Sequence, residues 1–521
     1  MKHLLFLIFA VQACLPGFAA CDGRVRIVPR PAEVEELPGS FRLTPRTPVV
    51  ITDEQLRTPA EIFARAVGKL TGTEPAVTAA PEKHAVTLQL QPGYEAEEYR
   101  LEVGRQRITV TASTPQAVLH GLRSLQQLVA GGEIPACVVR DKPTFAYRGA
   151  MLDVCRHFFP VEDVKTYIDI LSLHKINKFH WHLTDDQGWR IEIKKYPLLT
   201  QIGSRRAETL VGRYDKNKEG VYDGKPYGGF YTQEEIREIV SYAAERHIEV
   251  IPEIEMPGHG LAALTAYPWL GCTGGPYAVW THWGISDDVY CAGKETTFEF
   301  IEKVLTEVLA LFPSKLIHIG GDECPKGRWK ACPLCQQRIR EEGLKDEYQL
   351  QSYFIHRIER WMHTHGREII GWDEILQGGI SKTANIMSWN GSDPGIKAAQ
   401  RGNPVIMTPK WYCYFDYSQT SDPERYEPLG NTRYVSVRQA YRLDPCDRLT
   451  LPDQKRIRGV QCNLWTEYIA DIRHALHMVL PRMAALAETG WANDRKDYND
   501  FVRRIPALVA VYKAEGYNYA P

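Results

Sequence analysis

The chain has 521 residues, more than one ordinary domain, which indicates two domains. It is 44% hydrophobic and 24% charged, which is typical of a globular protein with a large buried core. Its 63 Lys and Arg residues balance 64 Asp and Glu residues, and the net charge of −1 gives no reason to expect nucleic acid or an anionic membrane as a partner.

The first 21 residues are predicted to be a signal peptide. A short basic start is followed by an apolar run, 4–11, that is too short to span a bilayer, and then by Ala19-Ala20-Cys21. Lipid attachment at Cys21, or at Cys14, and ordinary cleavage before Cys21 are the alternatives. Either way we expect export, to the periplasm or as an outer-membrane lipoprotein of a bacterium. No later segment is long and apolar enough to be a transmembrane helix.

Residues 24–141 are predicted to form a small α+β domain. Alternating apolar residues predict strands, and helical spacing predicts two helices, at 59–70 and 114–129. The predicted strands are 25–28, 86–90, 99–103 and 107–111. This part holds no recognisable group of catalytic residue types.

Residues 145–521 change to alternating strands and helices, which favours a parallel sheet. Eight strands over this length predict a (β/α)8 TIM barrel with long loops. The predicted strands are 150–154, 177–183, 248–253, 316–319, 368–372, 385–389, 405–408 and 459–465. The predicted helices include 161–174, 232–246, 297–311, 474–488 and 498–514.

The stretch 316–323 is the candidate centre of the chemistry. An apolar run ends at Gly320-Gly321, where the backbone can turn sharply, and Asp322 and Glu323 follow. If the two carboxyl groups sit close together, ionising one raises the pKa of the other, as acid/base catalysis requires. The alternative is that Asp322 caps a following helix and Glu323 is solvated.

The other predicted strands also end in polar and aromatic residues. Functional residues of such barrels lie at these carboxyl ends. Carboxylates can bind sugar hydroxyls and indoles can stack on a pyranose ring, so the set predicts a glycosidase. It comprises Arg156, Asp185, Asp186, Glu255, His259, Trp372, Asp373, Trp389, residues 412–416, Trp465 and Glu467.

Six motifs in this region make the chain similar to the β-N-acetylhexosaminidases, glycoside hydrolase family twenty. They are residues 148–156 (RGAMLDVCR), 180–190 (HWHLTDDQGWR), 252–259 (PEIEMPGH), 318–323 (HIGGDE), 371–374 (GWDE) and 464–467 (LWTE). Each motif alone is weak, but together and in this order they are highly specific. The small N-terminal domain also fits the companion domain of this family.

The resemblance implies a retaining, substrate-assisted mechanism in which the acetamido oxygen of the substrate attacks the anomeric carbon. It implies that Glu323 is the general acid and then the base, with a raised pKa. It implies that Asp322 stays ionised, holds the acetamido N–H and stabilises the oxazolinium-like intermediate.

The resemblance also implies roles for the sugar-binding residues. Arg156 would bind ring hydroxyls, and Asp185 and His259 would support the catalytic pair and the sugar. Trp372, Trp389 and Trp465 would wall the pocket. Tyr414 would bind the acetamido oxygen, with Tyr412 and Tyr417 as the alternatives, and Asp416 and Glu467 would take the distal hydroxyls.

The expected activity is exo-hydrolysis of terminal β-linked N-acetylglucosamine or N-acetylgalactosamine from an oligosaccharide or glycoconjugate, without metal or cofactor. The sequence leaves the glycan, the oligomeric state and a disaccharide-releasing, lacto-N-biosidase-like variant open.

Two rival functions come from other classes. A metal-dependent amidohydrolase would use His180, His182, His259, His318 and Asp322 as ligands. However, the His-x-His pair lies on the second barrel strand, and the last strand ends in Trp465-Thr466-Glu467 without a ligand aspartate. A silent sugar-binding protein would be expected to lack the acid, whereas Glu323 is present.

The cysteines give one further prediction. Export permits disulfides, and Cys272 and Cys291, which flank a Gly- and Trp-rich loop, are the best pair. Cys332 and Cys335, with Cys324 nearby, form either a disulfide or a zinc knuckle. Because no second Cys/His pair stands at finger spacing, the sequence argues against zinc.

Overall fold

The computed structural model describes residues 25–132, 134–215 and 218–521. The predicted signal peptide, with Cys14 and Cys21, lies outside these residues. None of the described helices is long and apolar enough to cross a membrane.

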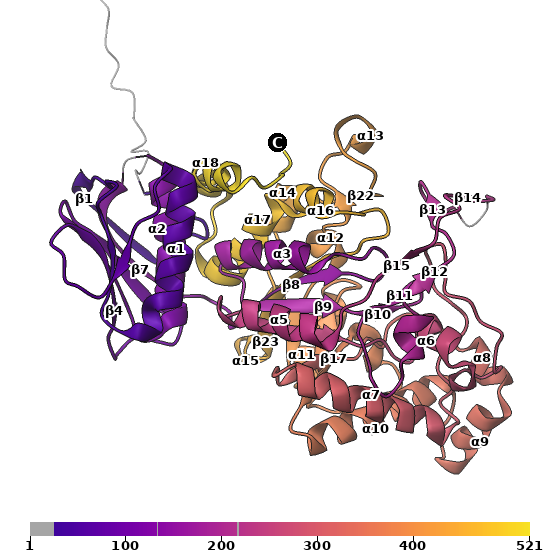
Figure 1. Ribbon diagram of the computed structural model, residues 1–521. Helices are drawn as coiled ribbons and strands as arrows, with labels where there is room; N and C mark the ends of the chain where they lie inside the picture. Colours follow the sequence, from indigo (N-terminus) through magenta and orange to yellow (C-terminus); the bar gives the residue numbers. More distant parts are fainter. Residues whose placement is uncertain (1–24, 133, 216–217) are drawn as a thin grey trace, which may run out of the picture.

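The first part of the chain folds as a seven-stranded mixed sheet with two helices on one face, α1 (Arg57–Thr71) and α2 (Pro115–Ala130). Figure 1 shows these helices between the sheet and the rest of the molecule. The strands, in sheet order, are β1 (Glu33–Phe41), β7 (Ile134–Asp141), β5 (Tyr99–Val103), β6 (Arg107–Ala112), β4 (Ala85–Leu90), β2 (Val49–Ile51) and β3 (Val77–Thr78).

The strand predicted at 25–28 is wrong. This segment runs beside α2, where Val28 exchanges two hydrogen bonds with the side chain of Gln127, of 2.9 and 2.7 Å. The side chain of Gln127 thus replaces a neighbouring strand as the hydrogen-bond partner of this backbone.

Eight parallel strands close into a barrel, as predicted. In chain order they are β8 (Tyr147–Asp153), β9 (Lys178–His182), β16 (Glu249–Glu253), β17 (Leu316–His318), β18 (Glu368–Trp372), β19 (Asn385–Ser388), β20 (Val405–Met407) and β23 (Ile457–Leu464). Apolar side chains fill part of the barrel, with Tyr147, Ile251, Leu316, Ile370, Met387 and Ile406 in one cluster. Buried polar side chains, among them His180, Glu253 and Gln461, fill the rest. The last residues of each strand lie at one rim.

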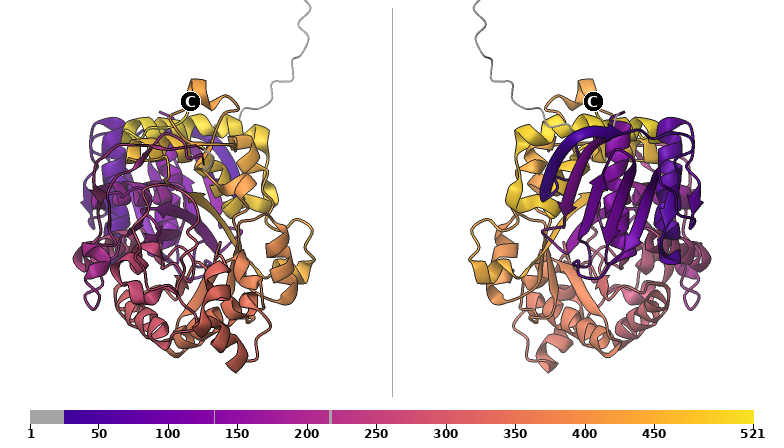
Figure 2. Two further views of the ribbon diagram at one scale, coloured as in Figure 1. Left: turned by 90° about the vertical axis from the view of Figure 1, so that its right-hand side faces the viewer. Right: turned by 90° about the vertical axis from the view of Figure 1, so that its left-hand side faces the viewer.

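Helices cover the outside of the barrel, and short elements build its loops (Figures 1 and 2). The longer helices are α3 (Val161–Leu173), α5 (Gln233–Ala244), α7 (Glu295–Leu311), α9 (Pro333–Glu341), α10 (Glu347–Thr364) and α11 (Asp393–Arg401). The shorter ones include α4 (Leu198–Gln201), α6 (Leu261–Ala266), α8 (Gly327–Ala331), α12 (Lys410–Cys413), α13 (Pro423–Tyr426), α14 (Val437–Tyr441) and α15 (Leu451–Gln454).

Loop strands pair locally in four two-stranded sheets. They are β10 (Thr184–Asp185) with β11 (Gly188–Trp189), β12 (Arg205–Arg206) with β15 (Tyr227–Gly228), β13 (Leu210–Val211) with β14 (Val221–Tyr222), and β21 (Tyr417–Ser418) with β22 (Asn431–Tyr434).

The last part of the chain differs from the prediction in one place. A single helix was expected at 474–488, but α16 (Ile472–Val479) ends before Pro481 and α17 (Arg482–Ala492) begins after it. Proline lacks the N–H that would continue the helix, so it separates the two. The final helix is α18 (Tyr498–Glu515), and it packs against α1 and α2.

A buried polar cluster joins the two parts of the molecule. Lys175, in the loop after α3, forms a 3.1 Å ion pair with Asp141 at the end of β7, and both side chains are fully buried. The indole N–H of Trp491 donates to the same carboxylate over 2.9 Å, and Tyr99 donates to it over 2.7 Å. The two parts of the molecule are therefore joined by a buried ion pair whose carboxylate also accepts two hydrogen bonds.

Candidate active site

A cavity opens at the carboxyl ends of the barrel strands. Of the residues that were given catalytic or sugar-binding roles, all except Trp372 line it. The lining consists of Arg156, Asp185, Glu255, His259, Asp322, Glu323, Trp389, Tyr414, Asp416, Tyr417, Asn431, Arg433, Trp465 and Glu467.

The turn after β17 aims the carboxylate pair into the cavity. Gly320 and Gly321 have φ angles of +67° and +92°, in the left-handed region that favours glycine. A Cβ on Gly320 would lie 1.7 Å from Glu255 Oε2, and one on Gly321 would lie 2.4 Å from Ile375 Cγ2. Glu323 itself has a φ of +42°, a strained conformation of the kind that clusters at functional sites.

His259 sits between the two carboxyl groups. Its Nε2 lies 3.5 Å from Glu323 Oε2 and 3.7 Å from Asp322 Oδ2. Burial opposes a charge on His259, but the Asp185 carboxylate outweighs it and raises the pKa of His259 well above its ordinary value. Asp322 and Glu323 therefore face a cation at neutral pH.

The pKa order of the pair in this unliganded site is the reverse of the predicted one. Burial raises the pKa of Asp322 to about 7. Burial would also raise the pKa of Glu323, but the hydrogen bond and charge of His259 outweigh it and lower this pKa below its ordinary value. Two differences set this order: the Asp322 side chain is 10% exposed against 34% for Glu323, and His259 lies slightly closer to Glu323.

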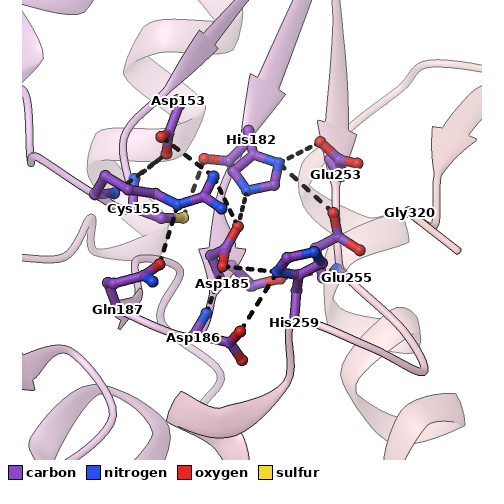
Figure 3. A network of polar contacts seen from close by, with 12 residues as sticks. Asp153, Cys155, His182, Asp185, Asp186, Gln187, Glu253, Glu255, His259 and Gly320 are labelled. Atoms are coloured by element: carbon purple, nitrogen blue, oxygen red, sulfur yellow. Dashed lines mark hydrogen bonds and ion pairs between the residues drawn. The ribbon is translucent and has the colours of Figure 1, made fainter. Parts of the chain in front are cut away.

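Asp185, on β10, connects most of the charged residues of the site (Figure 3). It accepts from Arg156 Nη1 at 2.9 Å, from His182 Nε2 at 2.8 Å and from His259 Nδ1 at 3.2 Å. Burial opposes ionisation of Asp185, but the charges of Arg156 and His259 hold its pKa below its ordinary value. This carboxylate orients His259 toward the catalytic pair.

Glu253, at the end of β16, forms the layer below. His180 Nε2 lies 2.9 Å from its carboxylate, His318 Nδ1 lies 2.8 Å from it, and His182 Nδ1 contacts it as well. Three of the four histidines that a metal-dependent amidohydrolase would use as ligands, His180, His182 and His318, thus contact this one acid beneath the cavity. The fourth, His259, lines the cavity itself. Figure 3 shows His182 between Glu253 and Asp185.

Trp372 also belongs to this lower layer. Its indole N–H donates to Glu253 Oε1 over 2.8 Å, and its side chain is only 1% exposed. Trp372 is not among the residues that line the cavity, but it contacts Trp465, which does, with 5.9 Å between the ring centroids.

The guanidinium of Arg156, which follows β8, forms several contacts with other side chains of the protein. Its Nε donates to Gln187 over 3.0 Å, and its Nη1 bonds Asp185 and, at 3.4 Å, Asp153. Its guanidinium also lies 5.0 Å from the Trp465 ring centroid. These contacts fix the plane of the guanidinium and turn it toward the cavity.

Three aromatic rings form one side of the cavity. Tyr414 stacks on Trp389, with ring centroids 5.9 Å apart and an angle of 13° between the planes. The Trp465 ring lies next to Tyr414, with 6.3 Å between the ring centroids. Of the three tyrosine candidates, Tyr414 and Tyr417 line the cavity and Tyr412 does not.

Comparison with known proteins identifies the family. The model of the glycosyl hydrolase family 20 catalytic domain matches residues 145–494, and the model of domain 2 of that family matches residues 24–142. The chain belongs to glycosyl hydrolase family 20. It is therefore a glycoside hydrolase.

Relatives in family 20 match over nearly the whole chain. A β-hexosaminidase of Porphyromonas gingivalis is 41% identical over 100% of this chain and 68% of its own length, and one of Vibrio furnissii is 38% identical over 89% and 76%. The crystal structure of a Vibrio harveyi exo-β-N-acetylglucosaminidase with N-acetylglucosamine has a TM-score of 0.86 and 32% sequence identity. The match covers 96% of this chain and 79% of that one. A mutant Streptomyces plicatus β-hexosaminidase in complex with its product has a TM-score of 0.83 and 32% sequence identity. The match covers 95% of this chain and 96% of that one.

The far side of this family 20 cavity carries two more acids, Asp416 and Glu467. Burial raises the pKa of both, and the Glu467 charge adds to the effect on Asp416. Asp416 Oδ1 has no hydrogen-bond partner among the described residues. These acceptors point to a ligand that brings hydroxyl donors.

Sequence reasoning missed three lining residues: Glu255, Asn431 and Arg433. Glu255 stands at a strand end and was named there, but not as a site residue; it is buried, and burial raises its pKa well above the ordinary value. Asn431 and Arg433 come from β22, in a long loop whose return to the cavity has no sequence signal. Arg433 donates to the Tyr417 hydroxyl over 2.8 Å.

Proposed function

We propose that this chain is an exo-acting β-N-acetylhexosaminidase that removes terminal β-linked N-acetylglucosamine or N-acetylgalactosamine with retention. The observation that carries this proposal is the Asp322-Glu323 pair at the end of β17. In this family 20 chain it faces a cavity with an aromatic wall on one side and buried carboxyl groups on the other.

Asp322 is proposed to hold the acetamido group. Its Oδ1 is buried and accepts no hydrogen bond from the described residues, so an acetamido N–H can donate to it. That bond favours the ionised carboxylate and lowers the pKa of Asp322 from its unliganded value of about 7. The ionised carboxylate then stabilises positive charge on the intermediate.

Glu323 is proposed to be the acid and then the base. Its side chain is 34% exposed, so a bound sugar removes water from it and raises its pKa. Substrate binding thus reverses the pKa order of the free site. Glu323 then gives its proton to the leaving oxygen as the acetamido oxygen bonds to the anomeric carbon and the glycosidic bond breaks. In the second step Glu323 takes a proton from water, which attacks the anomeric carbon and reopens the oxazolinium ring.

The aromatic side is proposed to hold the acetamide. The Tyr414 hydroxyl, which lines the cavity beside Trp389 and Trp465, can donate its proton to the acetamido oxygen and fix that oxygen for attack. Arg156, Asp416 and Glu467 are proposed to take the ring hydroxyls, with Asn431 and Arg433 beside them. A sugar end held by charged groups on its far side favours release of one residue over release of a disaccharide.

The test is hydrolysis of a panel of 4-nitrophenyl β-glycosides by the purified chain. The N-acetylglucosaminide and the N-acetylgalactosaminide should be cleaved. The glucoside and galactoside should resist despite the same leaving group, because they lack the internal nucleophile. A thiazoline mimic of the intermediate should inhibit wild type strongly and Asp322→Asn much less. Rapid cleavage of the plain glucoside, or a fluoro-sugar trapped covalently on Asp322, would overturn the proposal.

We also propose that the protein is exported and anchored by a lipid on Cys21. Support comes from the leader-like sequence of residues 1–21. Fractionation of cells expressing the full chain tests it. Wild type should partition with the outer membrane and Cys21→Ala should be soluble in the periplasm. Soluble wild type would contradict the anchor, and cytoplasmic wild type would contradict export.

A further inference from the structure

Four cysteines from two loops meet in one place beside the barrel. Cys272 and Cys291 lie in the segment between α6 and α7, and Cys332 and Cys335 lie at the start of α9. Their four sulfur atoms all lie within 4.8 Å of one another. Three of the four side chains are buried and Cys272 is half-buried. Figure 1 shows α8 and α9 next to α6 at this end of the molecule.

The predicted disulfide between Cys272 and Cys291 is wrong, because both thiols are free in the structure. The sulfurs stand farther apart than a bond. Cys272 and Cys335 are separated by 3.8 Å, Cys291 and Cys332 by 3.8 Å, and Cys291 and Cys335 by 3.6 Å. A disulfide would need about 2.05 Å. A tetrahedron of sulfurs around Zn²⁺ with Zn–S bonds of about 2.3 Å has edges of about 3.8 Å.

We propose that Cys272, Cys291, Cys332 and Cys335 bind one structural Zn²⁺ ion. The donor set is all sulfur and supplies four ligands, so it leaves no open position for water or substrate. Thiolates select zinc over Mg²⁺ or Ca²⁺, which prefer oxygen. The sequence argument against zinc searched for a second pair at finger spacing. The second pair here has 18 residues between its two cysteines, and only the fold brings it to the first pair.

The backbone around the four cysteines has features that favour metal binding. Cys332-Pro-Leu-Cys335 has the spacing of half a zinc knuckle, and Cys335 lies in the first turn of α9, where the helix dipole favours thiolate. A Cβ on Gly293 would lie 2.3 Å from the carbonyl carbon of Leu334, so only glycine lets the Cys291 segment approach the Cys332–Cys335 turn this closely.

The ion would tie together the loops that leave two catalytic strands. The first loop follows β16 and carries His259, and the second follows β17 and its carboxylate pair. Other contacts run along the same seam: Trp329 donates to the Tyr290 carbonyl over 2.9 Å, and the Tyr290 N–H bonds the carbonyl of Pro257 over 3.0 Å. The zinc site is therefore expected to support the position of His259 without touching substrate.

Metal analysis of the full chain, purified without added metal or a metal-affinity tag, tests the proposal. Inductively coupled plasma mass spectrometry should find about one zinc ion per chain. The four thiols should react with a thiol reagent only after denaturation with a chelator. Metal-free protein with two disulfides, metal-free protein with freely reacting thiols, or iron in place of zinc would each overturn the proposal.

Cys335→Ser and a matched control extend the test. Cys335→Ser should lose most of the zinc, whereas Cys446→Ser, which changes a half-buried cysteine outside the cluster, should keep it. If Cys335→Ser does not fold, chelation of wild type gives the same answer. Removing zinc should lower Tm, and adding zinc back should restore it, while Cys446→Ser should follow wild type in both steps. An unchanged Tm after proven loss of zinc would contradict the structural role.

Discussion

Glu323 combines an ion pair with His259, a left-handed backbone and partial exposure, and each of these bears on its proposed role as acid. Glu323→Gln should keep the fold but lose about 10²–10⁴-fold in turnover on substrates with poor leaving groups. Activated aryl glycosides should lose less, because their leaving groups need less protonation. Steady-state kinetics on the two substrate types measure the difference, with Glu299→Gln on the exposed face of α7 as the control. An equal loss on both types would point away from an acid role.

Asp322 should make the free protein less stable as pH rises. Burial raises the folded-state pKa of Asp322 to about 7, so the folded protein retains a proton that the unfolded chain has lost. The stability that this proton confers is present below pH 4 and is lost as pH rises to 7. Asp322→Asn mimics the neutral form and should stabilise the protein above pH 7, by up to about 4 kcal/mol.

Thermal unfolding from pH 4 to 8 measures this effect. The Tm advantage of Asp322→Asn should grow with pH and vanish near pH 4, while the exposed Asp287→Asn should follow wild type throughout. A pH-independent difference would show that the carboxyl group does not titrate as proposed.

At this scale the sequence predicted most of the cavity but not its electrostatics. Strand ends mark the residues that reach the rim, which is why Arg156, Asp185 and Glu467 were found. The pKa order of Asp322 and Glu323 depends on which carboxyl group His259 approaches more closely and on how much water each retains. Trp372 shows a related limit: a strand end indicates which rim a residue reaches, but not how deep its ring lies.

The turn after β17 has no room for side chains at Gly320 and Gly321. Gly321→Ala places a Cβ at a φ of +92° and 2.4 Å from Ile375, so the turn must move and carry Asp322 and Glu323 with it. We expect a loss of stability of about 1–3 kcal/mol together with a large loss of turnover. Gly327→Ala in α8 is the matched control, because its Cβ would meet nothing within 4 Å. Chemical denaturation and kinetics measure both effects, and a fully active Gly321→Ala would contradict this account.

The elements that the sequence predicted best are those with a strong local pattern. All eight barrel strands were found, because each is a short apolar run bounded by polar residues. Four strands of the N-terminal sheet were missed. The side chains of β1 are mostly exposed, β2 and β3 are only three and two residues long, and β7 contains Pro135. The break between α16 and α17 was visible in the sequence as Pro481, but the apolar periodicity on both sides concealed it.

On the scale of the whole molecule, the Lys175–Asp141 pair holds the two parts together. Lys175→Met would leave a buried carboxylate without its cation, so we expect a loss of about 3–5 kcal/mol in the free energy of unfolding. Turnover of the folded protein should be unchanged, because neither residue lines the cavity. Lys142→Met is the control: Lys142 pairs with Glu95 at the surface, where the side chains are 50% and 68% exposed, and should cost at most about 1 kcal/mol. Denaturant titration measures both, and equal losses would show that the junction does not depend on this pair.

The contact of α18 with α1 and α2 affects the order in which the chain can be completed. The helical layer of the N-terminal domain is among the first parts of the chain to be synthesised, but it is covered by one of the last. Trp491 and Ala492, at the end of α17, also enter the core of that domain. Until those residues emerge, the domain exposes an apolar surface, so its final packing waits for the end of synthesis. A nascent chain stalled before residue 491 would therefore present this surface to chaperones, although the entire seven-stranded sheet would already have been made.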